Sequence, residues 1–287
     1  MYFILSLTPL VQYHFALASF FIMISNTPKN LFKKSLQAGE KQIGVWSAMG
    51  NPVSAEICAG SGFDFVVIDA EHGPQHAESL IGQLQAIAGY PDCGEIIRAP
   101  SSDAAELRQI LDAGARSILV PMVDTAEEAA AIVEACRFPP DGARGLGSSR
   151  AARWGRYRDY FHRANEELCI MVQLETVVAM TNLEAIAAVE GVDAVFIGPA
   201  DLAASMGYIG KPLDPPVRAA VEDGVRRIVA AGKPAGSMVL DNNFASELLA
   251  IGASFVAVAI DTRMLFEGLN LALKDMRSLM SAVNNKN

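Results

Sequence analysis

Short apolar runs alternate with longer amphipathic stretches along the chain after residue 28. Stretches such as residues 103–115, 125–137 and 215–232 repeat apolar residues at i, i+3, i+4 and i+7, which predicts helices, and most of them end at a glycine. The short runs are continuously apolar, as is typical of strands in a parallel sheet that is covered on both faces. Eight such strands are predicted, at residues 43–46, 65–69, 95–98, 117–121, 170–175, 194–198, 235–239 and 255–260.

The number of strands favours a closed α/β barrel, with an open doubly wound sheet as the alternative. No GxGxxG motif follows the first strand, and polar residues follow nearly every strand, whereas an open sheet gathers them at one crevice. A chain of 287 residues suits one barrel. We therefore expect a single-domain α/β barrel over residues 26–287, whose longest insertion, residues 139–167, acts as a lid or subunit contact.

Residues 1–25 form a segment that we call the apolar leader. Residues 1–28 contain no Lys, Arg, Asp or Glu, and the apolar run is long enough for the roughly 20 residues of a membrane span. A signal peptide is disfavoured because no basic segment precedes the run. The apolar leader is either a membrane anchor or the product of an overextended reading frame, in which case the true start is Met23. We favour the second explanation. We then expect a first helix capped near Asn26 or Thr27, a cytoplasmic protein, and membrane contact only if the leader is real.

Composition narrows the expected partners. The net charge of -9 and the absence of a Lys/Arg-rich face disfavour nucleic acid. The four cysteines contain no CxxC pair, so they indicate neither a zinc knuckle nor a disulfide scaffold. They are typical of reduced thiols buried in a cytosolic protein.

Polar side chains follow the predicted strands at the end where α/β barrels build their active sites. Among them, Glu175 and Asp201 follow neighbouring strands and offer the hard oxygen ligands that suit Mg²⁺ or Mn²⁺. The alternative, which the pattern leaves open, is that each acid caps the helix that begins just after it. The full set of candidates at this rim is Trp46, Asp69, Glu71, His72, Arg98, Gln173, Glu175, Asp201, Met238 and Asp261.

His72 and Arg98 are the candidate catalytic residues of this rim. His72 lies beside Asp69 and Glu71, which favours an acid/base oriented by a carboxylate over a structural histidine. Arg98 closes the third strand, where it either grips a substrate carboxylate or pairs with Asp69 or Glu71. All eight lysines lie outside the predicted strand cores, so a Schiff base is disfavoured and electrophilic catalysis falls to the metal.

Seven segments together resemble a known family: FDFVVIDAEHGP, IIRAP, ILVPMVDTAEEA, RFPPDGARGLGSSRAARW, VQLET, EGVDAVFIGPADLAASMGY and FVAVAIDT. They are similar to the HpcH/HpaI aldolase family, the metal-dependent class II pyruvate aldolases. The resemblance runs from about residue 30 to about residue 275. It implies a (β/α)8 TIM barrel assembled as a homohexamer, a trimer of domain-swapped dimers in which the last helix packs on a neighbour.

The resemblance also implies roles for the rim residues. Glu175 and Asp201 match the metal ligands, with Co²⁺ as an alternative to Mg²⁺ or Mn²⁺. His72 matches the catalytic acid/base, Asp69 the carboxylate that supports it, and Arg98 the residue that binds the pyruvate carbonyl and stabilises its enolate.

Further positions match substrate contacts. Gln173 matches a substrate-binding amide, and Ser148, with Gly147, lies in a loop near the substrate. Backbone amides around Gly198, Pro199 and Ala200 are implied to hold the pyruvate carboxylate. Met238 stands where the family usually has a branched aliphatic residue, so aldehyde packing is expected to differ here.

The implied reaction is the metal-dependent retro-aldol cleavage of a 4-hydroxy-2-oxoacid to pyruvate and an aldehyde. The substrate is expected to be a 2-keto-3-deoxy sugar acid or a compound of the 4-hydroxy-2-oxoheptanedioate type. Arg150, Arg153 and Arg156 favour an acidic or polyhydroxylated aldehyde, unless they serve a subunit interface. The alternatives are a citryl- or malyl-CoA lyase of the same barrel type and a catalytically silent metabolite-binding barrel.

Overall fold

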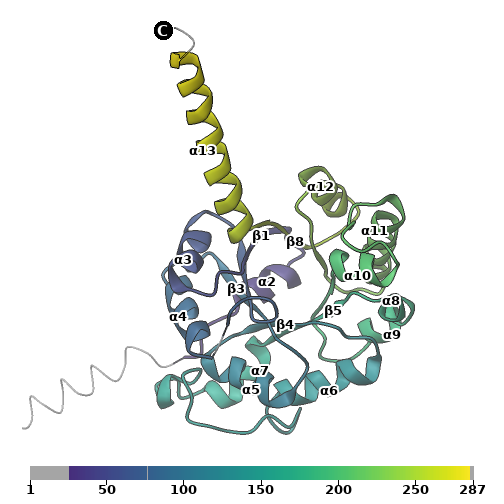
Figure 1. The fold of residues 1–287 in the computed structure, drawn as a ribbon. Helices are drawn as coiled ribbons and strands as arrows, with labels where there is room; N and C mark the ends of the chain where they lie inside the picture. Colours follow the sequence, from purple (N-terminus) through teal and green to yellow (C-terminus); the bar gives the residue numbers. More distant parts are fainter. Residues whose placement is uncertain (1–25, 76, 285–287) are drawn as a thin grey trace, which may run out of the picture.

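The computed structural model describes residues 26–75 and 77–284, which contain a closed barrel of eight parallel strands in sequence order (Figure 1). The apolar leader lies outside the described residues. The strands are β1 (Gln42–Ser47), β2 (Phe65–Asp69), β3 (Gly94–Arg98), β4 (Ser117–Val120), β5 (Cys169–Leu174), β6 (Ala194–Ile197), β7 (Ala235–Met238) and β8 (Phe255–Ile260).

Helices surround the barrel between successive strands (Figure 1). In chain order they are α2 (Leu31–Gln37), α3 (Pro52–Gly60), α4 (Ala77–Ile87), α5 (Ala104–Ala113), α6 (Ala126–Cys136), the 3-10 turn η1 (Arg153–Gly155), α7 (Tyr160–Glu167), α8 (Val177–Thr181), α9 (Leu183–Ala187), α10 (Pro199–Ser205), α11 (Pro215–Ala230), α12 (Asn242–Ala250) and α13 (Asp261–Asn284).

The barrel closes through hydrogen bonds between its first and last strands. Gln42 pairs with Phe255 and Trp46 pairs with Ile260, both in parallel register. The predicted (β/α)8 TIM barrel, a single α/β domain, is therefore confirmed, and each of the eight predicted strands lies within about one residue of its observed position. An open doubly wound sheet is excluded.

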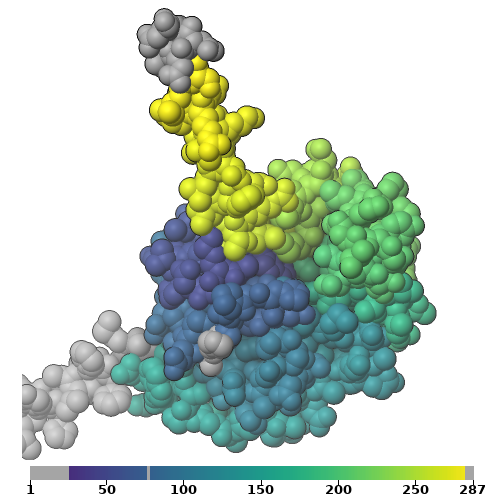
Figure 2. All heavy atoms as spheres, viewed as in Figure 1, coloured from purple at the N-terminus to yellow at the C-terminus, as the bar shows by residue number. Residues whose placement is uncertain are grey.

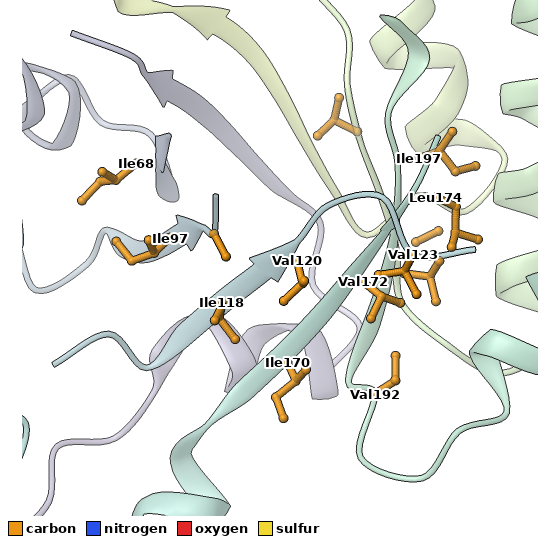
Figure 3. Close-up of a cluster of buried hydrophobic side chains, with 14 of the residues drawn as sticks. Ile68, Ile97, Ile118, Val120, Val123, Ile170, Val172, Leu174, Val192 and Ile197 are labelled. Carbon is orange, nitrogen blue, oxygen red and sulfur yellow. The ribbon is translucent and has the colours of Figure 1, made fainter. Parts of the chain in front are cut away.

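Two apolar layers hold the barrel together. Outward-facing strand residues pack beneath the helices, and Figure 3 shows part of this layer, including Ile118, Val172 and Ile197. Inside the barrel, aromatic rings fill the N-terminal half, where Phe32 of α2 meets Phe65 and Phe255 edge-on at 5.4 and 5.5 Å. The opposite, C-terminal end of the barrel is thereby left for polar side chains.

Helix α2 begins later than the sequence indicated. The predicted cap near Asn26 or Thr27 is wrong: Asn30 caps the helix by accepting a hydrogen bond from the backbone N–H of Lys33. Thr27 instead donates its backbone N–H and its hydroxyl to Asp159, at 2.8 and 2.9 Å. A distant carboxylate therefore decides which residue starts the helix.

The long insertion packs at the N-terminal end of the barrel. Arg150 donates to the carbonyl of Ala113, and the backbone N–H of Ala151 donates to the carbonyl of Asp112, both in the last turn of α5. This insertion contains η1 and α7, so it is more structured than a loop.

Helix α13 leaves the barrel as a projecting arm (Figures 1 and 2, yellow). Its exposed large apolar residues are Met264, Leu265, Phe266, Leu269, Leu271, Leu273, Met276, Leu279 and Met280. Within residues 26–75 and 77–284, no helix is both long enough and apolar enough to span a bilayer.

Candidate active site

A cavity of about 410 Å³ opens at the C-terminal end of the barrel. It is lined by side chains and backbone from the ends of β1, β3, β5, β6, β7 and β8 and from the first turns of α10 and α13. Of the residues predicted from the sequence, it brings together Trp46, Arg98, Gln173, Glu175, Gly198, Pro199, Ala200, Asp201 and Met238.

Arg98 at the end of β3 is held by two carboxylates. Asp69 accepts from its Nε at 2.9 Å and from its Nη2 at 2.6 Å, and Glu71 lies 2.8 Å from Nη1. The guanidinium also stacks over Trp46, 4.8 Å from the ring centroid. Arg98 is thus fixed in the cavity wall, and both ion pairs weighed from the sequence are present.

Asp69 is the deepest of the acids near Arg98. Burial alone would raise the pKa of Asp69, but the hydrogen bonds and charge of Arg98 outweigh burial and hold that pKa below its usual value. Asp69 also accepts the backbone N–H groups of Glu71 and His72, at 3.1 and 3.2 Å. The carboxylate therefore orders the turn that carries His72, which is an exposed residue, through its backbone.

Glu175 is a buried carboxylate that, among the described residues, accepts hydrogen bonds from neutral donors alone. Its Oε1 accepts the backbone N–H of Met122 at 2.8 Å, and its Oε2 accepts from Gln173 Nε2 at 2.5 Å. Burial raises the pKa of Glu175 to about 7, because it outweighs these hydrogen bonds, and the charges of Glu71 and Asp201 add to the shift. Within the described residues, no basic side chain forms an ion pair with Glu175.

Gly198 allows the end of β6 to approach Glu175. A Cβ atom at this position would lie 2.5 Å from Glu175 Oε2 and 3.1 Å from Gln173 Nε2. Any side chain there would push the carboxylate out of place. The sequence alone gives no sign of this requirement, because glycine also fits an ordinary helix start.

Neither Glu175 nor Asp201 is the side-chain cap of the helix beside it. The hydroxyl of Thr176 caps α8 by accepting from Ala179, and α10 begins at Gly198 without a side-chain cap. Asp201 is exposed in the first turn of α10. The side-chain capping alternative is therefore wrong for both acids, and both line the cavity.

Three residues that the sequence placed at the site do not line the cavity. Ser148 and Gly147 belong to the insertion that packs at the opposite end of the barrel, so they do not line this chain's cavity. Asp261 accepts backbone N–H bonds from Ala48 and Met49, which ties the loop after β1 to the end of β8. Its role in this chain is structural.

Sequence reasoning missed the outer part of the cavity. Leu213, Leu240 and Phe244 form an apolar wall, and Arg263 and Asp241 line the cavity beside it. These residues lie in loops and helix starts, where no periodic signal marks them. Asp241 also caps α12, a role that hides it among ordinary helix caps.

Residues 42–267 match the family model described as HpcH/HpaI aldolase/citrate lyase. The chain belongs to this family. It is 54% identical over 239 residues to the 4-hydroxy-2-oxovalerate aldolase of Rhodococcus jostii, covering 83% of this chain and 93% of that protein. It is 49% identical to the hydroxypyruvate/pyruvate aldolase of Pseudomonas aeruginosa, covering 84% of this chain and 91% of that protein.

A solved HpcH/HpaI family structure from Burkholderia cenocepacia superposes with a TM-score of 0.83 at 34% identity, covering 87% of this chain and all of that chain. Membership of the HpcH/HpaI family confirms the predicted resemblance and the predicted enzyme class, a carbon–carbon lyase of the aldolase type. The acyl-CoA lyase and silent-barrel alternatives are not favoured, because the relatives of about half identity are aldolases.

Proposed function

We propose that this protein cleaves a 4-hydroxy-2-oxoacid to pyruvate and an aldehyde, with a divalent metal on Glu175 and Asp201. The observation that carries the proposal is the pairing of the uncompensated carboxylate of Glu175 with the fixed guanidinium of Arg98 in one cavity. The related aldolases, by name, act on 4-hydroxy-2-oxovalerate, hydroxypyruvate or 4-hydroxy-2-oxo-heptane-1,7-dioate, which supports this substrate class.

The donor set fits Mg²⁺ or Mn²⁺. Both acids line the cavity, and the negative charge of Asp201 adds to the electrostatic cost of ionising Glu175. Among the described residues, no group of three or more His, Cys, Asp or Glu side chains is arranged to hold a metal. Mg²⁺ is commonly held by one or two carboxylates, with water and substrate oxygens completing its shell. When bound, such an ion would polarise the 2-oxo group and the carboxylate of the substrate.

His72 transfers the proton in the proposed reaction, and Arg98 stabilises the developing negative charge. His72 accepts the proton of the 4-hydroxyl group, directly or through a water, as the bond between C3 and C4 breaks and the aldehyde leaves. Arg98 donates to the oxygen of the 2-oxo group, where negative charge develops as pyruvate enolate forms. Asp69 holds the Arg98 guanidinium in position for this step. Protonation of C3 then gives pyruvate.

Gln173 and the start of α10 position the remaining groups. Gln173 holds the Glu175 carboxylate through its Nε2. Pro199 has no N–H, so the donors available to a substrate carboxylate are the backbone N–H groups of Ala200 and Asp201 in the first turn of α10. Met238 lines the same cavity and offers a flexible apolar contact to the aldehyde.

Several copies of the chain are expected to assemble through α13, as a trimer of dimers. The arm exposes a long apolar surface, and the main contacts of α13 with its own barrel are on β1 and β8. Ile43 on the outer side of β1 is 42% exposed, whereas the outward apolar residues of β2 to β6 are fully buried. If α13 of a second copy packed on the outer side of β1, it would cover Ile43 and also bury its own apolar face. Ser148 would reach a substrate only in such an assembly.

The proposal includes a cytoplasmic location, supported by four cysteines that are all buried and free. The reaction is tested by exchange of the pyruvate methyl protons in D₂O, followed by NMR with Mn²⁺ or Mg²⁺ and with chelator. Exchange that requires the metal supports enolate formation. Absence of exchange above the enzyme-free rate, with metal supplied, would remove the proposed reaction.

A further inference from the structure

A second cavity, of about 450 Å³, lies at the N-terminal end of the barrel. Gly94 begins β3 and Arg116 directly precedes β4, so both mark the end opposite to the active-site mouth. The two cavities share no lining residue. Within one chain, a ligand in this cavity would therefore contact none of the residues that line the active-site cavity.

Two arginines that line this cavity form no ion pair within the described part of the chain, although the whole chain carries a net charge of -9. Arg116 is neutralised by Glu95 through bonds of 2.8 and 2.9 Å. Arg150 and Arg153 make no ion pair with any residue of the described chain. Burial, and then the charge of Arg153, lower the pKa of Arg150, and the charge of Glu95 offsets this lowering only in part.

Arg150 also has a structural role, which has to be separated from ligand binding. It is 8% exposed, and its Nη1 donates to the carbonyl of Ala113 at the end of α5. Gly114 makes this approach possible, because a Cβ atom there would lie 2.8 Å from Nη1. The contact with the end of α5 uses only Nη1 of Arg150 and does not involve Arg153. The helix cap therefore does not explain why Arg153 is unpaired.

The rest of the cavity wall is apolar and aromatic. Ile87 and Leu84 of α4 line one part of it, with Tyr90 just beyond that helix. Tyr157 lines the same cavity, and its electrostatic interaction raises the pKa of both Arg116 and Arg150. The cavity combines a positive end with a wall that suits a flat or apolar body.

We propose that this cavity is a binding site for a small organic anion, whose phosphate or carboxylate group lies between Arg150 and Arg153 and whose apolar body lies against Tyr90 and Ile87. Guanidinium groups bind both anion types through paired, charge-assisted hydrogen bonds. The volume of this cavity exceeds that of an inorganic ion, which favours an anion that also carries an apolar organic group.

The test is calorimetric titration of the full chain with phenyl phosphate, benzoate and inorganic phosphate, in chelator so that the aldolase site has no metal. Saturable binding of phenyl phosphate is expected, with weaker binding of inorganic phosphate, which lacks the body. Binding of benzoate as well assigns the site to both anion types, and binding of phenyl phosphate alone assigns it to phosphate esters.

Arg153→Asn is the main variant, because Asn tolerates the left-handed backbone at this position, where φ is 47°. It should weaken phenyl phosphate about tenfold or more, as loss of one charge-assisted contact predicts. Arg150→Met should do the same, with thermal unfolding as a check on the helix cap. Arg158→Gln removes an exposed charge of the same insertion outside the cavity and should change binding less than twofold, by the same reasoning.

Several results would each overturn the proposal. They are absence of saturable phenyl phosphate binding, binding that Arg153→Asn leaves unchanged, and binding that is lost when pyruvate and Mn²⁺ saturate the other cavity. A lower oligomeric mass for Arg153→Asn without anion binding by the wild type would assign these arginines to a subunit contact, and would equally overturn it. Failure of the methyl-exchange test leaves the phenyl phosphate titrations of the wild type and the variants intact, because they are made without metal.

Discussion

Glu175 makes the metal-free protein less stable as the pH rises. Its pKa is about 7 in the folded chain and 4.5 in its usual state. Between these values the folded protein holds a proton that the unfolded chain has released, so the free energy of unfolding falls with rising pH. The stabilisation is complete below pH 4.5 and is lost as the pH passes 7.

The magnitude follows from the same two values. At about 1.4 kcal/mol for each tenfold change in proton affinity, charging Glu175 costs the folded state about 3 kcal/mol. For a domain of this size, that corresponds to roughly 6–12 °C in the midpoint of thermal unfolding. The loss should therefore be measurable by circular dichroism in chelator, between pH 5 and pH 8.

Glu175→Gln isolates this contribution. The variant cannot ionise, and Gln173 can turn its amide so that an oxygen faces the new side chain. At pH 5 the variant and the wild type should unfold at similar temperatures, and at pH 8 the variant should be more stable by about 3 kcal/mol. Glu190→Gln, an exposed position, should show no such pH-dependent difference.

Mn²⁺ provides the complementary result. At about 100 times its dissociation constant, a bound ion should stabilise the wild type at pH 8 by about 2.7 kcal/mol, and should leave Glu175→Gln unchanged because a ligand is lost. If the wild type and Glu175→Gln keep a constant difference in unfolding midpoint from pH 5 to pH 8, the carboxylate is not charged at a cost, and the reasoning fails.

Four further outcomes are expected. Arg98→Ala should reduce pyruvate methyl exchange by about 100-fold or more, as loss of a donor to a developing oxyanion predicts, and wild-type exchange at saturating Mn²⁺ would contradict its role. His72→Ala should slow turnover of the aldehyde substrate by about 100-fold, and unchanged turnover would remove His72 from the mechanism. Gly198→Ala should weaken Mn²⁺ binding, measured by calorimetry, because its Cβ would displace Glu175; equal affinity would show that the carboxylate can move. Leu265→Glu with Leu269→Glu should lower the mass measured by light scattering, since both residues are exposed on α13, and an unchanged mass would exclude the arm from the interface.

Sequence periodicity predicted the strands and the barrel because both depend on local patterns. The outward face of each strand meets helices and the inward face meets other strands, so each strand is continuously apolar. The rim candidates could also be predicted, since every parallel strand ends at the same side of the barrel. Arg98, Gln173, Glu175 and Asp201 reach one cavity for this reason.

The pattern could not decide what each polar group contacts. Whether Glu175 caps a helix depends on Thr176, which takes that role, and whether Arg98 is free depends on Asp69 from another strand. The shift of the first helix start to Asn30 likewise depends on contacts with distant residues of the insertion and α7.

The sequence by itself determined the order of strands and helices and the polar residue types at the end of each strand, because both depend on short stretches of sequence. Only the tertiary structure decided the burial that raises the pKa of Glu175, the close approach at Gly198 and the position of the insertion at the opposite end of the barrel. Burial and electrostatic interactions act between residues that are distant in sequence, and so they exist only once the barrel has closed.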